Sequence, residues 1–286
     1  MTQLFTDTSA NLPIGLALQH KIKILPFSYT VNGVEQPYDP TVEFNGPAYY
    51  NAIAAGAEVK TAMINITAFY NAFRPVLAAG HNVLYLGMSG GISGTAGAAA
   101  AAAAELQAEF PNQKIKVVDT LAASLGEGLL VLRAARLLEK GKPFEAVLAD
   151  ALTQRKTLCQ YFVVDSLEHL HRGGRVSKAA AVFGSVLHIK PLLTGDAQGK
   201  IVLNAKVRGR RQALAELANR YGELAANPAA TVGIAHANNP EGAAALEKLL
   251  REKGFAGQCL TVCYEPVTGA HVGPGTVALF FAGVHK

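Results

Sequence analysis

The chain contains no tryptophan, and it has only three cysteines and three methionines among its 286 residues. An odd and low cysteine count excludes the disulfide framework of small secreted domains. Charged residues are also scarce, at 16%, and the formal net charge is only +5. So small an excess gives little attraction for nucleic acid or for an anionic membrane. Because half of the residues are apolar, a disordered or fibrous chain is excluded as well.

We expect neither a secretory leader nor a membrane span. Met1 leads directly into a short strand-like segment, without the basic and then apolar stretch of a signal peptide. Residues 75–104 lack Asp, Glu, Lys and Arg, but glycines and hydroxyl groups interrupt them. A membrane span is more uniformly apolar than this. We therefore expect a cytoplasmic protein.

Strand-like and helical segments alternate through the first half of the chain, which is typical of a parallel sheet covered on both faces. Asn32-Gly33 between two valines predicts a hairpin with a type I′ turn. The predicted strands are residues 3–5, 22–29, 82–87 and 115–119, and the predicted helices are residues 13–20, 47–56, 67–80, 93–110, 121–140 and 143–160.

The second half is richer in strands and predicts a mixed sheet. Its predicted strands are 161–164, 191–194, 200–207, 231–235, 258–264 and 277–281, and its predicted helices are 177–188, 210–225 and 241–254. We therefore predict an α/β protein of two domains. Residues 1–155 form an N-terminal α/β/α domain with a parallel sheet, and residues 156–286 form a C-terminal α+β domain with a mixed sheet.

The glycine-rich segment GMSGGISGT at 87–95 follows a predicted strand and opens an alanine-rich helix. A helix N-terminus offers unpaired N–H groups and a partial positive charge, so it can hold an anion. Ser89, Ser93 and Thr95 add hydroxyl donors. The alternative is that Ser93 only caps the helix while the glycines only form the turn. Composition alone leaves both interpretations open.

The same segment matches the G-x-S-x-G nucleophile elbow, with Ser89 at its centre. Asp165 and His271 follow later in the chain and could complete a triad. No companion oxyanion motif such as HGGG occurs, and the helix begins after Ser93. An α/β-type serine hydrolase therefore stays as the alternative function. No P-loop, no G-x-G-x-x-G and no metal-ligand spacing occurs, so we predict no metal and no nucleotide cofactor.

Six motifs, in order along nearly the whole chain, resemble those of the DegV family of fatty-acid-binding proteins. The most specific is DSLEHLHRGGRVS at 165–177, which resembles the family's DDLxYLxKGGRIS block. The others are TDTSANL at 6–12, GISGT at 91–95, VDT at 118–120 with GEG at 126–128, IKPLL at 189–193 with KVR at 206–208, and HVGPGT at 271–276.

The resemblance implies a carrier without catalytic residues, a monomer that binds one long-chain fatty acid such as palmitate between its two domains. It places the carboxylate at Thr61 and Ser93, with Gly94, Thr95 and His271 beside them. It also implies an ATP-dependent fatty acid kinase as partner, no nucleic acid, and only transient contact with membranes.

In this reading Arg175 and Arg208 form the docking surface for the kinase, whose acyl-phosphate product enters phospholipid synthesis. The chain departs from the family where TSQPS is replaced by TAMIN at 61–65, so that only the threonine remains. It also departs before the helix turn, where the family's pair of serines is reduced to Ser89-Gly90.

Overall fold

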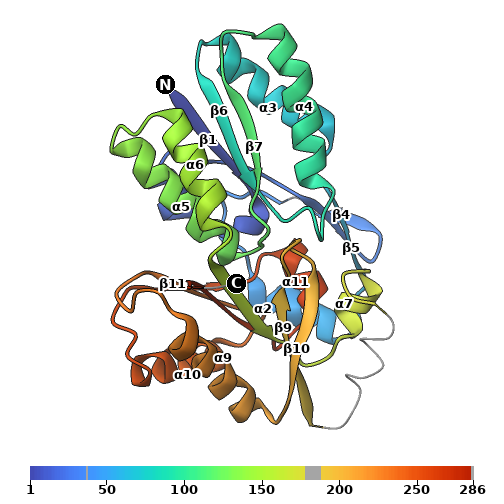
Figure 1. Ribbon diagram of the computed structural model, residues 1–286. Helices are drawn as coiled ribbons and strands as arrows, with labels where there is room; N and C mark the ends of the chain where they lie inside the picture. Colours follow the sequence, from blue (N-terminus) through green and yellow to red (C-terminus); the bar gives the residue numbers. More distant parts are fainter. Residues whose placement is uncertain (37, 178–187, 285–286) are drawn as a thin grey trace.

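A computed structural model describes residues 1–36, 38–177 and 188–284 (Figure 1). The described residues form three sheets. Sheet A is parallel and has the strand order β2-β1-β6-β7, and sheet B is antiparallel with the order β4-β3-β5. Sheet C has the order β10-β9-β8-β13-β11-β12 and is antiparallel except for the pair β11–β12.

The elements of the first half are β1 (Thr2–Asp7), η1 (Thr8–Ala10), α1 (Ile14–Gln19), β2 (Lys23–Leu25), β3 (Ser28–Val31), β4 (Val34–Gln36), α2 (Gly46–Ala54), β5 (Val59–Ala62), α3 (Ile66–Ala78), β6 (Asn82–Gly87), α4 (Thr95–Glu109), β7 (Ile115–Asp119), α5 (Leu125–Glu139) and α6 (Phe144–Gln154). Those of the second half are β8 (Leu158–Val163), α7 (Glu168–Arg172), β9 (Ile189–Gly195), β10 (Ile201–Arg208), α9 (Arg210–Leu224), β11 (Val232–His236), α10 (Pro240–Glu252), β12 (Cys259–Cys263), α11 (Pro266–Val272) and β13 (Val277–Ala282).

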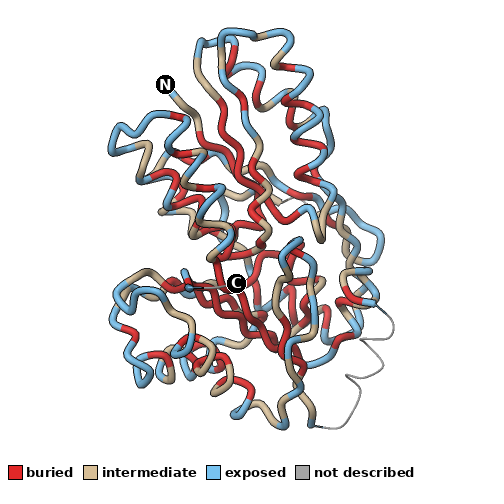
Figure 2. Tube along the Cα trace, viewed as in Figure 1, coloured by how far each residue is buried: buried red, intermediate tan, exposed pale blue. Residues whose placement is uncertain are grey.

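Sheet A is covered on both faces by helices, as the sequence predicts. Helices α3 and α4 lie on one side of it, and α5 and α6 lie on the other (Figure 1). Its central strand β6 is buried along almost its whole length, which explains why it reads as a continuous apolar run. In Figure 2 strand β6, in the upper part of the view, is coloured as buried along most of its length.

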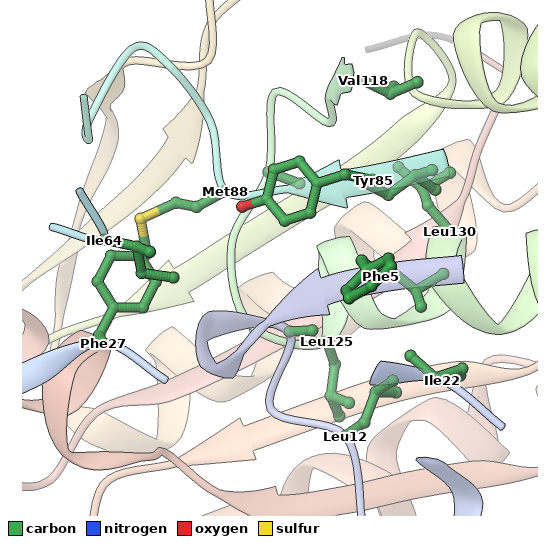
Figure 3. Packing of buried hydrophobic residues seen from close by; sticks show 14 of the residues in the cluster. Phe5, Leu12, Ile22, Phe27, Ile64, Tyr85, Met88, Val118, Leu125 and Leu130 are labelled. Atoms are coloured by element: carbon green, nitrogen blue, oxygen red, sulfur yellow. The ribbon is translucent and has the colours of Figure 1, made fainter. Parts of the chain in front are cut away.

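Sheet C has two differently covered faces. Alternate residues of β8 such as Cys159 and Tyr161 pack with α9 and α10 in one apolar cluster. Phe162, on the opposite face of the same strand, belongs to the larger cluster that continues into sheet A. Because side chains alternate along a strand, β8 contributes one wall to each of the two cores. Figure 3 shows part of the larger cluster, where the side chain of Met88 extends toward Phe27 and Ile64.

Sheet B and α2 come from the first half of the chain but pack against α11 of the second half. The hydroxyl of Tyr49 donates to the carbonyl of Pro266 at 2.5 Å, and that of Tyr50 donates to the carbonyl of Tyr264 at 2.9 Å. A boundary near Arg155 separates sheet A from sheet C, and we propose it as the domain boundary. Sheet B and α2 lie before this boundary but pack against an element that follows it.

Several predicted elements are wrong in their bounds. The predicted strand at 22–29 is two strands in different sheets, because Pro26 cannot donate to a ladder and interrupts it. The predicted helix at 121–140 begins only at Leu125, after Leu121 and Ser124 adopt positive φ. The predicted helix at 143–160 ends at Gln154, and its last residues belong to β8. Most of the predicted helix at 177–188 lies outside the described residues.

The hairpin prediction is confirmed, since Asn32 and Gly33 have φ of 50° and 79° between β3 and β4. The strand β5 and the short helices α7 and α11 were not predicted. Within the described residues, no helix has both the length and the apolar character needed to cross a membrane.

Candidate functional site

A cavity of about 1040 Å³, counted to its open mouth, lies where the carboxyl ends of the strands of sheet A face sheet C. This is the edge at which open α/β sheets bind ligands. Most of the wall is apolar, and α11 closes one side of it. The apolar lining residues include Phe27, Met63, Met88, Ile92, Ala122, Ala123, Phe162, Leu170, Ile201, Val267, Val272 and Phe280.

Polar side chains gather in one part of this wall. Oγ1 of Thr61, on β5, is hydrogen-bonded to Nε2 of His271, on α11, at 2.9 Å. Arg175 donates from Nε to the carbonyl of Ile92 at 2.9 Å, which places its guanidinium beside Ser93. The structure thus brings together four of the residues singled out from the sequence.

Ser93 and Gly94 reach the cavity because two carboxylates fix the backbone of the loop between β6 and α4. Asp7 accepts a hydrogen bond from the backbone N–H of Met88 at 3.1 Å, and Asp119 accepts one from Gly90 at 3.1 Å. Helix α4 begins at Thr95 with Gly94 as its N-cap, so the cap position belongs to Gly94 and not to Ser93. Oγ of Ser93 contacts Oγ1 of Thr95 at 2.9 Å. Thr95 is fully buried behind it and is not part of the described wall.

Arg175 is the only Lys, Arg, Asp or Glu side chain in the described wall of the cavity. Burial lowers the pKa of the Arg175 guanidinium from its usual value. Among the described residues, no carboxylate forms an ion pair with Arg175, and Asp165 pairs instead with Lys190 and Arg210. Burial and the charge of Arg175 also lower the pKa of His271 to about 4, so the imidazole is neutral near pH 7. A half-buried guanidinium without a carboxylate partner favours an anionic ligand.

Gly173 allows His271 to approach this loop. A Cβ at Gly173 would lie 2.2 Å from Nδ1 of His271, so the ring that is hydrogen-bonded to Thr61 would have to shift. The first glycine of the pair in the 165–177 motif is therefore required because any larger residue would collide with His271.

Three buried carboxyl groups beneath the cavity were missed as site elements by the sequence reasoning. Oγ of Ser9 donates to Glu127 at 2.6 Å and contacts Asp7 at 2.5 Å. Burial raises the pKa of both carboxyl groups, and it raises the pKa of Glu265, the N-cap of α11, to about 7. Asp7 and Glu127 stand within the TDT and GEG motifs, so the signal was present but gave no role.

The proposed hydrolase triad does not form among the described residues. Ser89 is fully buried and donates to the carbonyl of Gly199 at 2.9 Å. His271 bonds to Thr61, and Asp165 pairs with Lys190 and Arg210, each at 2.6 Å. The elbow motif is therefore a structural turn that joins the loop after β6 to the turn between β9 and β10.

Arg208 lies apart from the other predicted residues. It is exposed at one end of β10, whereas Ile201 at the other end lines the cavity. Seven residue-to-residue steps along the strand separate Ile201 from Arg208, which corresponds to about 23 Å. Within the described residues no group of three or more His, Cys, Asp or Glu could hold a metal ion.

Comparison with known proteins identifies the family. The family model described as "Uncharacterised protein, DegV family" matches residues 1–283. A DegV domain-containing protein of Clostridium perfringens is 36% identical over 284 residues, with 99% of this chain and 98% of the relative covered. The chain therefore belongs to the DegV family.

Solved structures of the family have the same two-domain α/β fold. One describes fatty acid binding of a DegV family protein from Thermus thermophilus, with a TM-score of 0.88, 29% identity and 99% of each chain covered. Another is a fatty acid binding DegV family protein from Streptococcus agalactiae, with a TM-score of 0.86, 29% identity and 98% of each chain covered.

Proposed function

We propose that this protein binds one long-chain fatty acid in the cavity and presents its carboxylate to an ATP-dependent fatty acid kinase. The observation that carries the binding step is an apolar cavity in which Arg175, the only charged residue of the described wall, lies beside Ser93 and His271. The fatty acid binding described for the Thermus thermophilus and Streptococcus agalactiae relatives supports the same ligand.

The energetics favour a fatty acid over a small anion. About fifteen methylenes at roughly 0.8 kcal/mol each give on the order of 12 kcal/mol of transfer free energy. This exceeds the low end of what association costs. Hydrogen bonds to a carboxylate add roughly 1.5–3 kcal/mol each. The apolar wall therefore sets affinity, while Thr61, Ser93, Gly94 and His271 set the direction in which the acid lies.

Presentation to a kinase rests on the family resemblance and on the position of the polar residues. Met63, at the edge of the cavity, is half exposed, so the head group would lie close to solvent. We further propose that Arg175 contacts the head group, that Arg208 belongs to the docking surface, and that the protein acts as a monomer in the cytoplasm, supplying acyl-phosphate for phospholipid synthesis.

Native mass spectrometry of the purified protein tests the binding step. The protein should be heavier than its sequence by one fatty acid, and the added mass should disappear on denaturation. An acyl-enzyme on Ser89 would keep the added mass after denaturation. Ester cleavage that depends on Ser89, from protein without bound lipid, would overturn the carrier proposal.

A further inference from the structure

Gln160 is a polar residue in the apolar part of the cavity wall. It lies on β8 and faces the same side as Phe162, about 7 Å further from the end of the strand that leads to α7 and Arg175. Its side chain is nine-tenths buried, with 9% of its surface exposed. The backbone pairs with Phe280 on the neighbouring strand, whose ring also lines the cavity.

One hydrogen bond fixes the orientation of the Gln160 amide. Nε2 donates to the carbonyl of Leu121 at 2.7 Å, so the nitrogen points to the loop after β7 and the oxygen points away from it. Gly195 leaves room for this arrangement, because a Cβ there would lie 2.5 Å from Nε2. Among the described residues, none donates a hydrogen bond to Oε1 of Gln160.

An amide oxygen without a donor, on a residue that lines an apolar cavity, has a consequence for the ligand. A plain acyl chain passing Gln160 leaves Oε1 without a donor, whereas a hydroxyl group on the chain would supply one. Burying a hydroxyl in an apolar cavity is unfavourable unless it finds an acceptor. Oε1 of Gln160 is one acceptor that the wall offers, and Oγ1 of Thr268, which has no partner among the described residues, is another.

We propose that Gln160 is a specificity-determining residue that allows the cavity to take fatty acids with a hydroxyl group along the chain. This inference rests on the proposed fatty acid function and adds a substrate class to it. The wild-type protein accepts a hydroxylated chain with little loss relative to the plain chain, because the hydrogen bond to Oε1 offsets the desolvation of the hydroxyl.

The test compares stearic acid with a positional series of hydroxystearic acids in competition for a fluorescent fatty acid. In the wild-type protein at least one hydroxy isomer should bind within about threefold of stearic acid. In Gln160→Leu the same isomer should lose at least about tenfold relative to stearic acid, which is about 1.4 kcal/mol. The ratio of the two affinities within one variant cancels any general effect of the substitution on folding or on the loop at Leu121.

Phe162→Leu is the matched control, because it changes the same face of the same strand without altering a polar group. It should change both affinities and leave their ratio as in the wild-type protein. An unchanged ratio in Gln160→Leu, or rejection of every hydroxy isomer by the wild-type protein, would overturn the role of Gln160. Failure of the wild-type protein to bind stearic acid at all would instead reject the proposed function on which this role rests.

Discussion

Thr61 and His271 are hydrogen-bonded through Oγ1 and Nε2 at 2.9 Å, although 210 residues separate them in the sequence. Thr61 belongs to an exposed three-stranded sheet, and His271 belongs to a short helix that is buried on nearly all sides. Because the imidazole is neutral near pH 7, this bond fixes its orientation without a second charge beside Arg175. The pair defines the polar end of the cavity.

Replacing the hydroxyl groups of this end should weaken fatty acid binding without unfolding the protein. Ser93→Ala and Thr61→Ala should each lower palmitate affinity about tenfold, since each removes a hydrogen bond to a carboxylate. Displacement of a fluorescent fatty acid measures the change. Thr153→Ala, which removes an exposed threonine on α6, should leave affinity unaltered. Wild-type affinity in both cavity variants would remove these residues from the site.

Substitutions of Arg175 and Arg208 should have different effects on palmitate affinity and on phosphorylation by the kinase. Arg175→Gln removes the only charge in the described wall and should lower palmitate affinity by about tenfold or more. Arg208→Gln should leave palmitate affinity unchanged and slow phosphorylation by the kinase, with a weaker dependence on salt. Affinity measurements and kinase assays at two salt concentrations distinguish the roles. If Arg175→Gln keeps its lipid and only phosphorylation fails, both arginines belong to the docking surface.

The buried carboxyl of Glu265 should make the protein less stable as the pH rises from about 4.5 to 7. Its pKa is raised to about 7 in the folded state, chiefly by burial, from 4.5 when exposed. In this interval the folded state holds a proton that the unfolded state has lost, so the free energy of unfolding decreases with pH. The effect of this group is on the order of 3 kcal/mol.

Denaturant titrations of Glu265→Gln at several pH values check this dependence. The glutamine keeps an acceptor for one of the two N–H groups, that of Val267 or that of Thr268. Its NH2 group faces the other one, so the variant should fold with a lower stability at every pH. Its stability should fall less steeply with pH than that of the wild-type protein. Asp7 and Glu127, whose pKa values are also raised by burial, should retain part of the slope. An identical slope in both proteins would show that Glu265 ionises normally.

Two helical glycines offer a paired test of packing at α11. Gly269→Ala would place a Cβ 1.9 Å from the hydroxyl of the fully buried Tyr50 and should cost about 1–3 kcal/mol of stability. Gly97→Ala on α4 meets nothing within 4 Å and should stabilise the protein by up to about 1 kcal/mol. Thermal unfolding of both variants measures the difference. Equal effects would mean that α11 shifts freely.

The sequence predicts the parallel sheet and the glycine-rich turn before α4 well because their signals are local. The apolar run of β6, the glycines after it and the alanine-rich helix α4 follow one another directly. Thr61 and Arg175 could be named only from motifs of a known family, and nothing in the spacing of Thr61, Ser93, Arg175 and His271 shows that the four residues meet. Their meeting depends on the packing of α11 against sheet B.

Other features could not be predicted because tertiary contacts decide them. β5 has alternating burial over only four residues, and α11 has only seven residues. Both are too short for periodicity to reveal. The depth of Gln160 and the burial of Glu265 follow from the face that each strand or helix end turns inward, which composition does not specify.

The packing of sheet B and α2 against α11 has a consequence for synthesis. Translation at 5–20 residues per second would deliver Thr61 roughly 10–40 s before His271, its partner 210 residues later. During that interval sheet B and α2 lack the carbonyls of Tyr264 and Pro266, to which the hydroxyls of Tyr50 and Tyr49 donate. On the ribosome, the first domain can form around sheet A while sheet B and α2 keep their aromatic face uncovered until the end of the chain is synthesised.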